Sequence, residues 1–216
     1  YPVEYQLMGV NQIQVHPQFG LTFASALRSI LRQDPDIIMI GEMRDGETAQ
    51  IAVQSALTGH LVLSTLHTNN AASAVVRLLD MGVEPYLITS SVVGVLAQRL
   101  VRRLCSTCKV PTSLPEATRK TLGLTTSDSR GPFYKAVGCA DCRQTGYRGR
   151  AGIHELLVMD DALRAAILAG EDATALHNRA VQGGMTTLHL DGLRKVAEGV
   201  TSLDELLRVT QDQGNA

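Results

Sequence analysis

The sequence predicts an α/β fold with a parallel sheet, followed by a small metal-binding lobe and a mostly helical end. Three observations support this prediction. The first hundred residues alternate strand-like apolar runs with segments of helical periodicity. Two Cys-x-x-Cys pairs follow, and most segments after them show the spacing of amphipathic helices. With 216 residues, of which 44% are apolar, the chain can bury one core plus a smaller satellite unit.

The charge balance argues against a strong field over the whole molecule. Twenty basic and twenty-one acidic residues give a net charge of -1, so no global attraction to nucleic acid or to an anionic membrane is expected. Apolar stretches such as residues 92–97 are far shorter than the roughly 20 residues of a membrane span, and no signal peptide opens the chain. We therefore expect a cytosolic protein. Because the chain starts at Tyr1 and continues at once with PVEYQL, we interpret it as a fragment.

The first expected elements are a short strand and a helix. Residues 12–15, QIQV, are expected to form the strand. Apolar residues within 23–31 then recur at i, i+3, i+4, i+7 and i+8, which is the stripe of an amphipathic helix. Thr22 is the expected N-cap. The Asp-Pro pair at 34–35 should end the helix, because the residue before a proline avoids the helical conformation.

A β-α-β unit is expected next. Residues 36–40 contain four consecutive large apolar residues, which predicts a strand buried on both faces. A helix is expected over 46–58, with Asp45 as N-cap and Gly59 as terminator. A second buried strand should cover 61–66. A helix that links two parallel strands forms the right-handed crossover unit of parallel sheets.

The remaining expected elements are mainly helices. Helical patterns cover residues 71–81 and continue from Pro85 onward, and residues 152–159 are expected to form a strand. Ser202 followed by Glu205 fits a capping box. Four amphipathic helices are expected over residues 161–169, 174–182, 187–198 and 203–211. Three histidines here lack metal-ligand spacing and are expected to be packed or solvated: His154, His177 and His189.

Two pairs of cysteines predict a structural zinc site. In each pair, two intervening residues let a tight turn aim both sulfurs at one tetrahedral ion. The four residues are Cys105, Cys108, Cys139 and Cys142. About 30 residues separate the pairs, so a helix over 111–124 and a loop over 127–131 should form an excursion. Disulfides or redox thiols are the alternative, but disulfides are rare in the cytosol. Four thiolates would fill the zinc shell and leave no open catalytic position.

An acid and a histidine follow the two buried strands. Glu42 comes just after strand 36–40, and His67 ends strand 61–66. If the strands are parallel, both side chains lie at the carboxyl edge of the sheet, where ligands of open α/β sheets bind. His60 precedes its strand, and a run of seven residues spans roughly 20 Å at about 3.3 Å each. The two histidines are therefore not expected to share one site.

Three arginines near this edge could bind phosphate or contact a neighbouring subunit, because a guanidinium fork suits phosphate and carboxylate oxygens. Arg28 and Arg32 lie four residues apart on the polar face of their helix, and Arg44 follows Glu42 by two residues. A solvated basic face is the alternative. A second basic group surrounds the first cysteine pair and is expected to be solvated rather than to meet acidic lipid or an acidic partner: Arg99, Arg102, Arg103 and Lys109.

The chain closely resembles the secretion ATPases, the hexameric motors of type II secretion and type IV pilus assembly. The resemblance rests on LTFASALRSILRQDPDIIMIGEMRDGETAQIAVQSALTGHLVLSTLHTNNAASAV, on GVEPYLITSSVVGVLAQRLVRRLC, on the four cysteines and on GYRGRAGIHELL. It implies three consecutive parts. These are part of a RecA-like ATPase core over residues 1–104, a tetracysteine zinc lobe over 105–142, and a helical C-terminal subdomain over 143–216.

The resemblance also implies roles for individual residues. IIMIGE matches the Walker B strand, so Glu42 would support the magnesium ion and the attacking water. PVEY matches the end of the aspartate box, which would make Glu4 the second catalytic acid and general base. TGHLVLSTLHT matches the histidine box and points to His60 and His67, with His67 better placed to sense the γ-phosphate. The implied cofactors are ATP, Mg²⁺ and Zn²⁺.

The partners that the resemblance implies are a homohexamer of the full-length protein and inner-membrane secretion platform proteins. Contact with the inner face of the cytoplasmic membrane would then be indirect. The cysteine tetrad favours an assembly or secretion motor, since retraction motors of the pilus usually lack it. Residues 82–105 and GIHELL at 152–157 favour type II secretion, and type IV pilus assembly is the alternative. A non-enzymatic, zinc-stapled interaction module is the alternative of another class.

The sequence departs from the family pattern at the phosphate-binding loop. No G-x-x-x-x-G-K-[ST] motif is present, because none of the four lysines follows a glycine. In phosphate-loop enzymes this loop supplies the backbone N–H groups and the lysine that hold the phosphates. By itself the chain is therefore expected to bind ATP weakly and to hydrolyse it negligibly.

Overall fold

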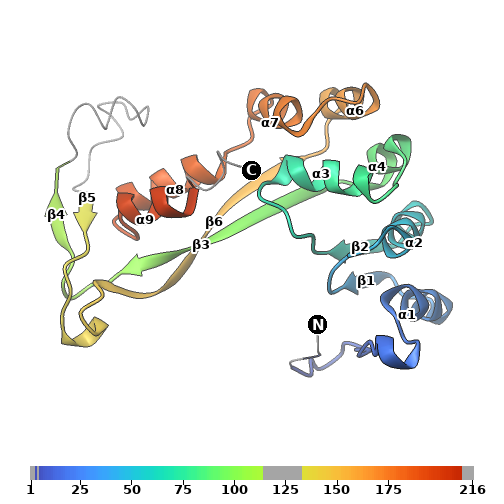
Figure 1. The fold of residues 1–216 in the computed structure, drawn as a ribbon, viewed down its shortest axis with the longest axis horizontal. Helices are drawn as coiled ribbons and strands as arrows, with labels where there is room; N and C mark the ends of the chain where they lie inside the picture. The colour runs from blue at the N-terminus through green and yellow to red at the C-terminus, as the bar shows by residue number, and fades with distance from the viewer. Residues whose placement is uncertain (1–2, 4, 114–132, 211–216) are drawn as a thin grey trace. The chain divides into compact units, whose positions relative to one another are not determined.

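The structure, a computed structural model, describes residues 3, 5–113 and 133–210. The chain divides into two compact units, each made from two separate stretches (Figure 1). The first unit comprises residues 1–95 and 157–182, and the second comprises residues 96–156 and 183–216. The three parts expected from the sequence, residues 1–104, 105–142 and 143–216, are functional divisions and remain a prediction, because the two units reflect only which residues lie close together.

The first unit contains the predicted β-α-β unit. Strands β1 (Ile37–Ile40) and β2 (Leu61–Ser64) pair in parallel, with Ile37 opposite Leu61, and helix α2 (Gly46–Leu57) links them (Figure 1). Helix α2 begins as predicted, because the Asp45 carboxylate accepts a hydrogen bond from the Thr48 N–H at 2.8 Å. It ends before Gly59, whose φ of +105° suits a residue without a side chain.

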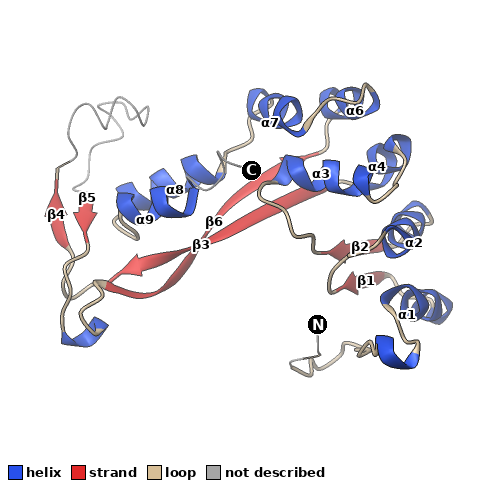
Figure 2. Cartoon of the chain, in the orientation of Figure 1, coloured by secondary structure: helices blue, strands red, loops and turns tan. Residues whose placement is uncertain are grey.

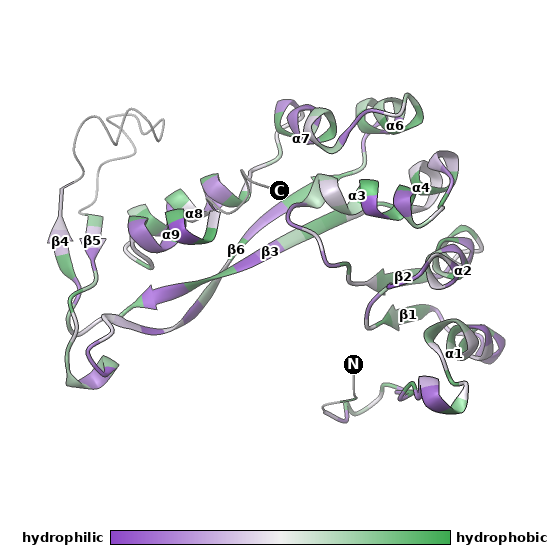
Figure 3. Ribbon diagram, in the orientation of Figure 1, coloured by the Kyte–Doolittle hydropathy of each residue, from purple (hydrophilic) through white to green (hydrophobic). Residues whose placement is uncertain are grey.

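The sheet of the first unit is covered on one face only among the described residues. Ile38 and Ile40 are buried against α1 and α2, where they contact Leu27 and Ala52. On the other face, Ile37 is 62% exposed and Met39 is 71% exposed. Apolar residues nevertheless run along both strands (Figure 3). The prediction that strand 36–40 is buried on both faces is therefore wrong for this chain, because no described segment covers the second face.

Helix α1 (Phe23–Ile30) begins at Thr22, as predicted. The Thr22 hydroxyl accepts a hydrogen bond from the Ser25 N–H at 3.2 Å, and the Ser25 hydroxyl accepts one from the Thr22 N–H at 2.9 Å. The 3-10 turn η2 (Leu31–Gln33) follows, and the chain leaves the helix before Pro35. Both ends of the helix thus follow from local rules.

The strand predicted over residues 12–15 does not form. These residues have no strand partner in the described part of the chain, and the nearest pairing is an isolated bridge between His16 and Leu21. The bridge encloses the 3-10 turn η1 (Pro17–Phe19). A strand needs a neighbour to satisfy its backbone groups, and a pattern of four residues cannot supply one.

Four helices complete the first unit. Helices α3 (Ala71–Asp80) and α4 (Pro85–Ser91) follow β2, as the sequence predicts. Helices α6 (Asp161–Leu168) and α7 (Ala173–Gln182) come much later in the chain but lie beside α4 and α3 (Figure 1). Contacts distant in sequence therefore close this unit.

The second unit is built on two long strands, β3 (Gly94–Leu104) and β6 (Tyr147–Val158), which pair with each other (Figure 2). The helical pattern expected to continue from Pro85 stops at α4, so that prediction is wrong beyond residue 91. The buried side chains of β3 explain the error: Ala97, Val101 and Leu104 are four and three residues apart, which is also helical spacing. Pairing with β6 decides between the two structures.

A small antiparallel sheet and two helices complete the second unit. Strand β4 (Val110–Thr112) pairs with β5 (Phe133–Lys135). Most of the helix predicted over 111–124, and all of the loop predicted over 127–131, lie outside the described residues; residues 111–112 belong to β4 instead. Helices α8 (Leu188–Ala197) and α9 (Leu203–Thr210) match their predictions. None of the helices in the described ranges is long and apolar enough to cross a membrane.

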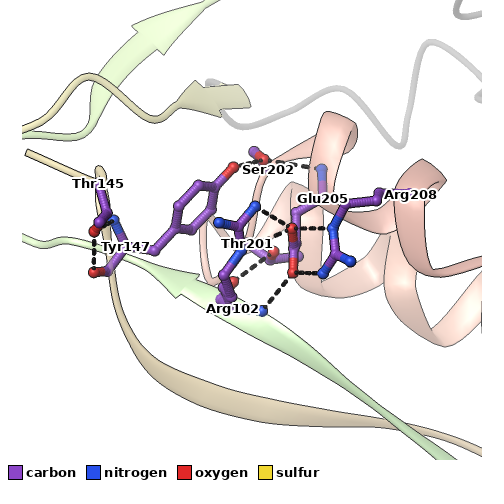
Figure 4. A network of polar contacts seen from close by, with 7 residues as sticks. All are labelled: Arg102, Thr145, Tyr147, Thr201, Ser202, Glu205 and Arg208. Atoms are coloured by element: carbon purple, nitrogen blue, oxygen red, sulfur yellow. Dashed lines mark hydrogen bonds and ion pairs between the residues drawn. The ribbon is translucent and has the colours of Figure 1, made fainter.

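A buried carboxylate joins β3 to α9 (Figure 4). The Glu205 carboxylate accepts a hydrogen bond from the Arg102 backbone N–H at 3.0 Å, and its oxygens also bind the guanidinium groups of Arg102 and Arg208. Half of the predicted capping box forms, because the Ser202 hydroxyl accepts from the Glu205 N–H at 3.2 Å. The arginines take the carboxylate that a full box would use. Arg102 also lies over the Tyr147 ring, while its side chain is 47% exposed, so it makes structural contacts in addition to the solvation expected for it.

This network lowers the pKa of Glu205 to about 2. Burial alone would raise that pKa, but the hydrogen bonds from Arg208 and Arg102 outweigh the burial. A carboxylate whose pKa is lower in the folded state than in the unfolded state stabilises the fold at pH values above its unfolded pKa. The stabilisation should therefore be complete above pH 4.5, the ordinary value for glutamate, and should be lost as the pH falls towards 2.

Replacing Glu205 by glutamine should destabilise the second unit by about 2 kcal/mol at neutral pH, because two arginines lose the negative charge and one acceptor oxygen of their buried partner while both still reach solvent. Urea unfolding of the wild type and the variant measures the difference. We expect the difference to shrink as the pH falls from 4.5 towards 2, because the unfolded chain then binds a proton at Glu205 while the folded carboxylate stays ionised, which removes the stabilisation. Glu198, which is exposed, provides the matched control as Glu198→Gln. A difference that stays constant down to pH 3 would contradict the assignment.

Candidate functional site

The residues that follow β1 and β2 bring an acid and a histidine together. Glu42 lies just beyond β1 and is completely buried. Its Oε2 atom is 2.9 Å from Nε2 of His67, which follows β2, and its Oε1 atom contacts the Arg44 guanidinium. The parallel pairing of β1 and β2 is what places both residues at one edge of the sheet, as the sequence predicts.

Thr65 helps to hold this edge of the sheet together, although the sequence did not lead us to predict a role for it. Its hydroxyl donates a hydrogen bond to the Gly41 carbonyl at 2.6 Å. Its own carbonyl accepts one from the Met43 N–H at 3.1 Å. The segments on either side of Glu42 are thus fixed to the end of β2. A hydroxyl two residues before His67 was the available signal, but its role depends on the strand register.

Glu42 is held in its ionised form. Burial alone would raise its pKa, but the hydrogen bonds and charges of Arg44 and His67 lower the pKa below its usual value. A carboxylate that is ionised at the carboxyl edge of a parallel sheet can ligate a magnesium ion or orient a water molecule. The chemistry of this edge therefore fits a metal-dependent reaction.

The other histidine candidate lies elsewhere. Nδ1 of His60 is 2.9 Å from the Ser55 carbonyl and 3.2 Å from the Thr58 hydroxyl, at the C-terminal end of α2. Because His60 precedes β2 and His67 follows it, the two side chains lie at opposite ends of this strand, in agreement with the sequence argument.

Of the three candidate arginines, the structure places Arg44 beside Glu42 and Arg28 in a contact elsewhere. Arg28 forms an exposed ion pair with Glu47 at 2.6 Å, and this pair links α1 to α2. Arg32 is exposed in η2. Arg44 is the arginine at the edge, where it contacts Glu42. Glu4 lies outside the described residues. The roles of these side chains remain predictions.

The four cysteines form one cluster in the second unit. Their sulfur atoms all lie within 4.8 Å of one another, and the cysteines form no disulfides. The Sγ atoms are 3.9 Å apart for Cys105 and Cys139, 3.8 Å for Cys108 and Cys142, and 3.7 Å for Cys139 and Cys142. Zinc–sulfur bonds of about 2.3 Å in a tetrahedron place sulfur atoms about 3.8 Å apart. The spacing therefore fits a zinc ion.

Backbone groups favour the thiolate form at this cluster. Burial would raise the pKa of Cys142, but hydrogen bonds from the N–H groups of Cys139 and Gly146, each at 3.2 Å, lower it to about 6. Burial and the neighbouring sulfurs raise the pKa of Cys108 to about 11. A bound cation would stabilise thiolates at all four positions, since metal ligation requires deprotonated sulfur. Gly138 has a φ of +123°, and a Cβ there would lie 2.7 Å from the Gln144 carbonyl oxygen.

The fold and these sites define an α/β protein of the class that includes the secretion and pilus ATPases. The Legionella pneumophila ATPase DotB matches 98% of this chain and 50% of its own, with a TM-score of 0.66 and 23% identity. The pilus retraction motor PilT with bound ADP matches 90% of this chain and 45% of its own, with a TM-score of 0.61 and 25% identity.

The chain belongs to the Type II/IV secretion system protein family, whose model matches residues 1–208. It is 56% identical to the type IV pilus assembly ATPase PilB of Thermus thermophilus over 97% of this chain and 24% of that protein. It is 56% identical to the type II secretion system protein HxcR of Pseudomonas aeruginosa over 98% of this chain and 41% of that protein. For the type II secretion system ATPase E of Vibrio cholerae the values are 55%, 98% and 42%. The chain therefore spans less than half the length of these relatives.

Proposed function

We propose that this chain is part of a motor ATPase that hydrolyses ATP to power protein secretion through the type II secretion system. The observation that carries the proposal is the contact between the buried Glu42 carboxylate and the exposed His67 ring at the carboxyl edge of two parallel strands. Relatives named as type II secretion proteins share 55% and 56% identity with the chain. Type IV pilus assembly is the second candidate function, because a pilus assembly ATPase is 56% identical.

The proposed reaction is phosphoryl transfer to water on a RecA-like core. Magnesium bound with ATP would neutralise charge on the phosphates. Glu42, as an ionised carboxylate, would support that ion and orient the attacking water. His67 would donate a hydrogen bond from its ring to the γ-phosphate. Glu4 would accept the proton of the water as general base.

The contact between Glu42 and His67 has a consequence for this mechanism. Each carboxylate oxygen of Glu42 already has a cationic or hydrogen-bonding partner, His67 on one side and Arg44 on the other. For ATP hydrolysis, the metal and the water would therefore have to replace part of the contacts that Glu42 makes with His67 and Arg44. Arg44 would then be available to a phosphate oxygen.

The rest of the proposed assembly follows from family membership. The cysteine cluster would hold one structural Zn²⁺ ion, the full-length protein would form a homohexamer, and Arg28 or Arg32 would contact a neighbouring subunit. The partners would be platform proteins of the inner membrane, with the motor located at its cytoplasmic side and in contact with the membrane only through them. Nucleic acid is not among the proposed partners.

A comparison of His67→Ala with His60→Ala in the proposed full-length protein tests the proposed site. We expect His67→Ala to lower steady-state phosphate release by about a hundredfold, because the γ-phosphate loses a donor. His60→Ala should cost less than about tenfold, because His60 binds Ser55 and Thr58 at the other end of β2. The reverse order would contradict the assignment of the site. Wild-type turnover in both variants would remove both histidines from the mechanism, whereas absence of turnover in the wild type itself would favour the non-enzymatic interaction module.

A further inference from the structure

The second unit contains a hollow that the proposed ATPase mechanism does not use. It lies along β6 and α8 and has a volume of about 410 Å³, within the range of small-molecule sites. His154 and Leu156 come from β6, and Asp191, Arg194 and Lys195 come from α8. Gly184, Met185 and Thr186 complete the lining.

The lining carries more positive than negative charge. Asp191, whose side chain is only 8% exposed, is 2.6 Å from Lys195 Nζ and 3.0 Å from Arg194 Nη2, and accepts a hydrogen bond from the His154 backbone N–H at 3.0 Å. Two cations thus face one carboxylate whose oxygens are already occupied. The Arg194 side chain is 71% exposed, and it also forms a longer ion pair with Glu198 at 3.9 Å. Its guanidinium therefore keeps donors for a further acceptor.

The imidazole of His154 is placed by a glycine. A Cβ atom at Gly152 would lie 2.7 Å from two atoms of the His154 ring, so the ring occupies space that only glycine leaves open. The His154 side chain is 44% exposed, and its Nδ1 atom lies 3.9 Å from Asp191 Oδ2. His154 and Thr186 both line the hollow. The lining residues thus include an imidazole, a hydroxyl and a guanidinium, which are all hydrogen-bond donor groups, together with the apolar side chains of Leu156 and Met185.

We propose that this hollow binds a phosphate group, carried either by a soluble small molecule or by a lipid headgroup. Arg194 donates to the phosphate oxygens through its planar fork, and His154 and Thr186 donate from the strand and the loop before α8. Asp191 acts as a positioning residue, because it holds Lys195 and Arg194 at the wall of the hollow. Leu156 and Met185 contact the carrier of the phosphate.

Calorimetric titration with glycerol 3-phosphate tests the proposal on the full protein, with ADP and magnesium at saturation so that a nucleotide site is already filled. We expect millimolar binding by the wild type and about tenfold weaker binding by Arg194→Gln, which still leaves Asp191 paired with Lys195. Arg103→Gln is the matched control, because Arg103 is exposed in the same unit and does not line the hollow. The affinity of Arg103→Gln for glycerol 3-phosphate should equal that of the wild type.

Gly152→Ala gives an independent test that removes no charge. The added Cβ should displace the His154 ring, whose free end can move without unfolding the strand, and so weaken binding severalfold. Thermal melting checks that both variants stay folded. If the protein sediments with phosphatidylglycerol vesicles, and Arg194→Gln but not Arg103→Gln abolishes this, the phosphate belongs to a lipid headgroup. If the protein binds glycerol 3-phosphate but not the vesicles, the phosphate belongs to a soluble molecule. No binding of either probe, unchanged affinity in Arg194→Gln or Gly152→Ala, or an equal loss in Arg103→Gln would overturn the proposal.

Discussion

In the full-length motor ATPase that we propose, Glu42→Gln should lower the rate of ATP hydrolysis by at least about a hundredfold while nucleotide binding stays intact. Glutamine keeps the size and the acceptor oxygen of glutamate but loses the negative charge. The charge is what the site maintains, since Arg44 and His67 lower the pKa of this completely buried carboxyl group. A neutral amide would support the metal poorly and would not polarise the attacking water.

Steady-state phosphate release and equilibrium binding of a fluorescent ATP analogue measure the two halves of this prediction. Glu47→Gln is a suitable control, because Glu47 lies in the same unit and forms only an exposed ion pair with Arg28. Thermal melting should confirm that Glu42→Gln is folded, since the change also weakens the contacts to Arg44 and His67. Turnover close to that of the wild type in a folded variant would remove Glu42 from the mechanism.

Purified protein should contain about one zinc ion per chain, and Cys139→Ser should lose most of it. The sulfur spacing of 3.7 to 3.9 Å fits one tetrahedral ion, and structural zinc sites in small domains contribute apparent binding energies of about 10 kcal/mol or more. Loss of one thiolate from four should therefore loosen the lobe formed by the cysteines, β4 and β5. Among the described residues of this lobe, little else can replace the metal, because β4 and β5 contain three residues each.

Elemental analysis gives the metal content, and hydrogen exchange reports on the lobe. We expect faster exchange at residues 105–112 and 133–147 in Cys139→Ser, with unchanged exchange in the first unit. Ser106→Ala alters an exposed residue of the same turn without removing a ligand, and should keep the zinc. Near-zero zinc in the wild type under reducing conditions, with four thiols open to alkylation, would show that the cluster is not a zinc site.

Features with short-range causes could be predicted from the sequence. The N-caps Thr22 and Asp45 bind N–H groups three residues further on, so residue type and spacing suffice to locate both helix starts. The β-α-β unit follows from two apolar runs joined by a helix, and its parallel pairing brings Glu42 and His67 to one edge. The cysteine cluster follows from ligand spacing, even though its two halves lie far apart in the chain.

The sequence by itself therefore determined the helix starts at Thr22 and Asp45, the strand crossover that places Glu42 beside His67, and the convergence of the four cysteines. Only the tertiary structure decided that Gly94–Leu104 is a strand, because its buried residues have helical spacing and the choice depends on pairing with β6. Only the tertiary structure decided that Glu205 binds Arg102, more than a hundred residues away, instead of completing its own helix cap. Local rules fix backbone conformation within a few residues, whereas strand partners, covered faces and ion pairs depend on which distant segments the folded chain brings together.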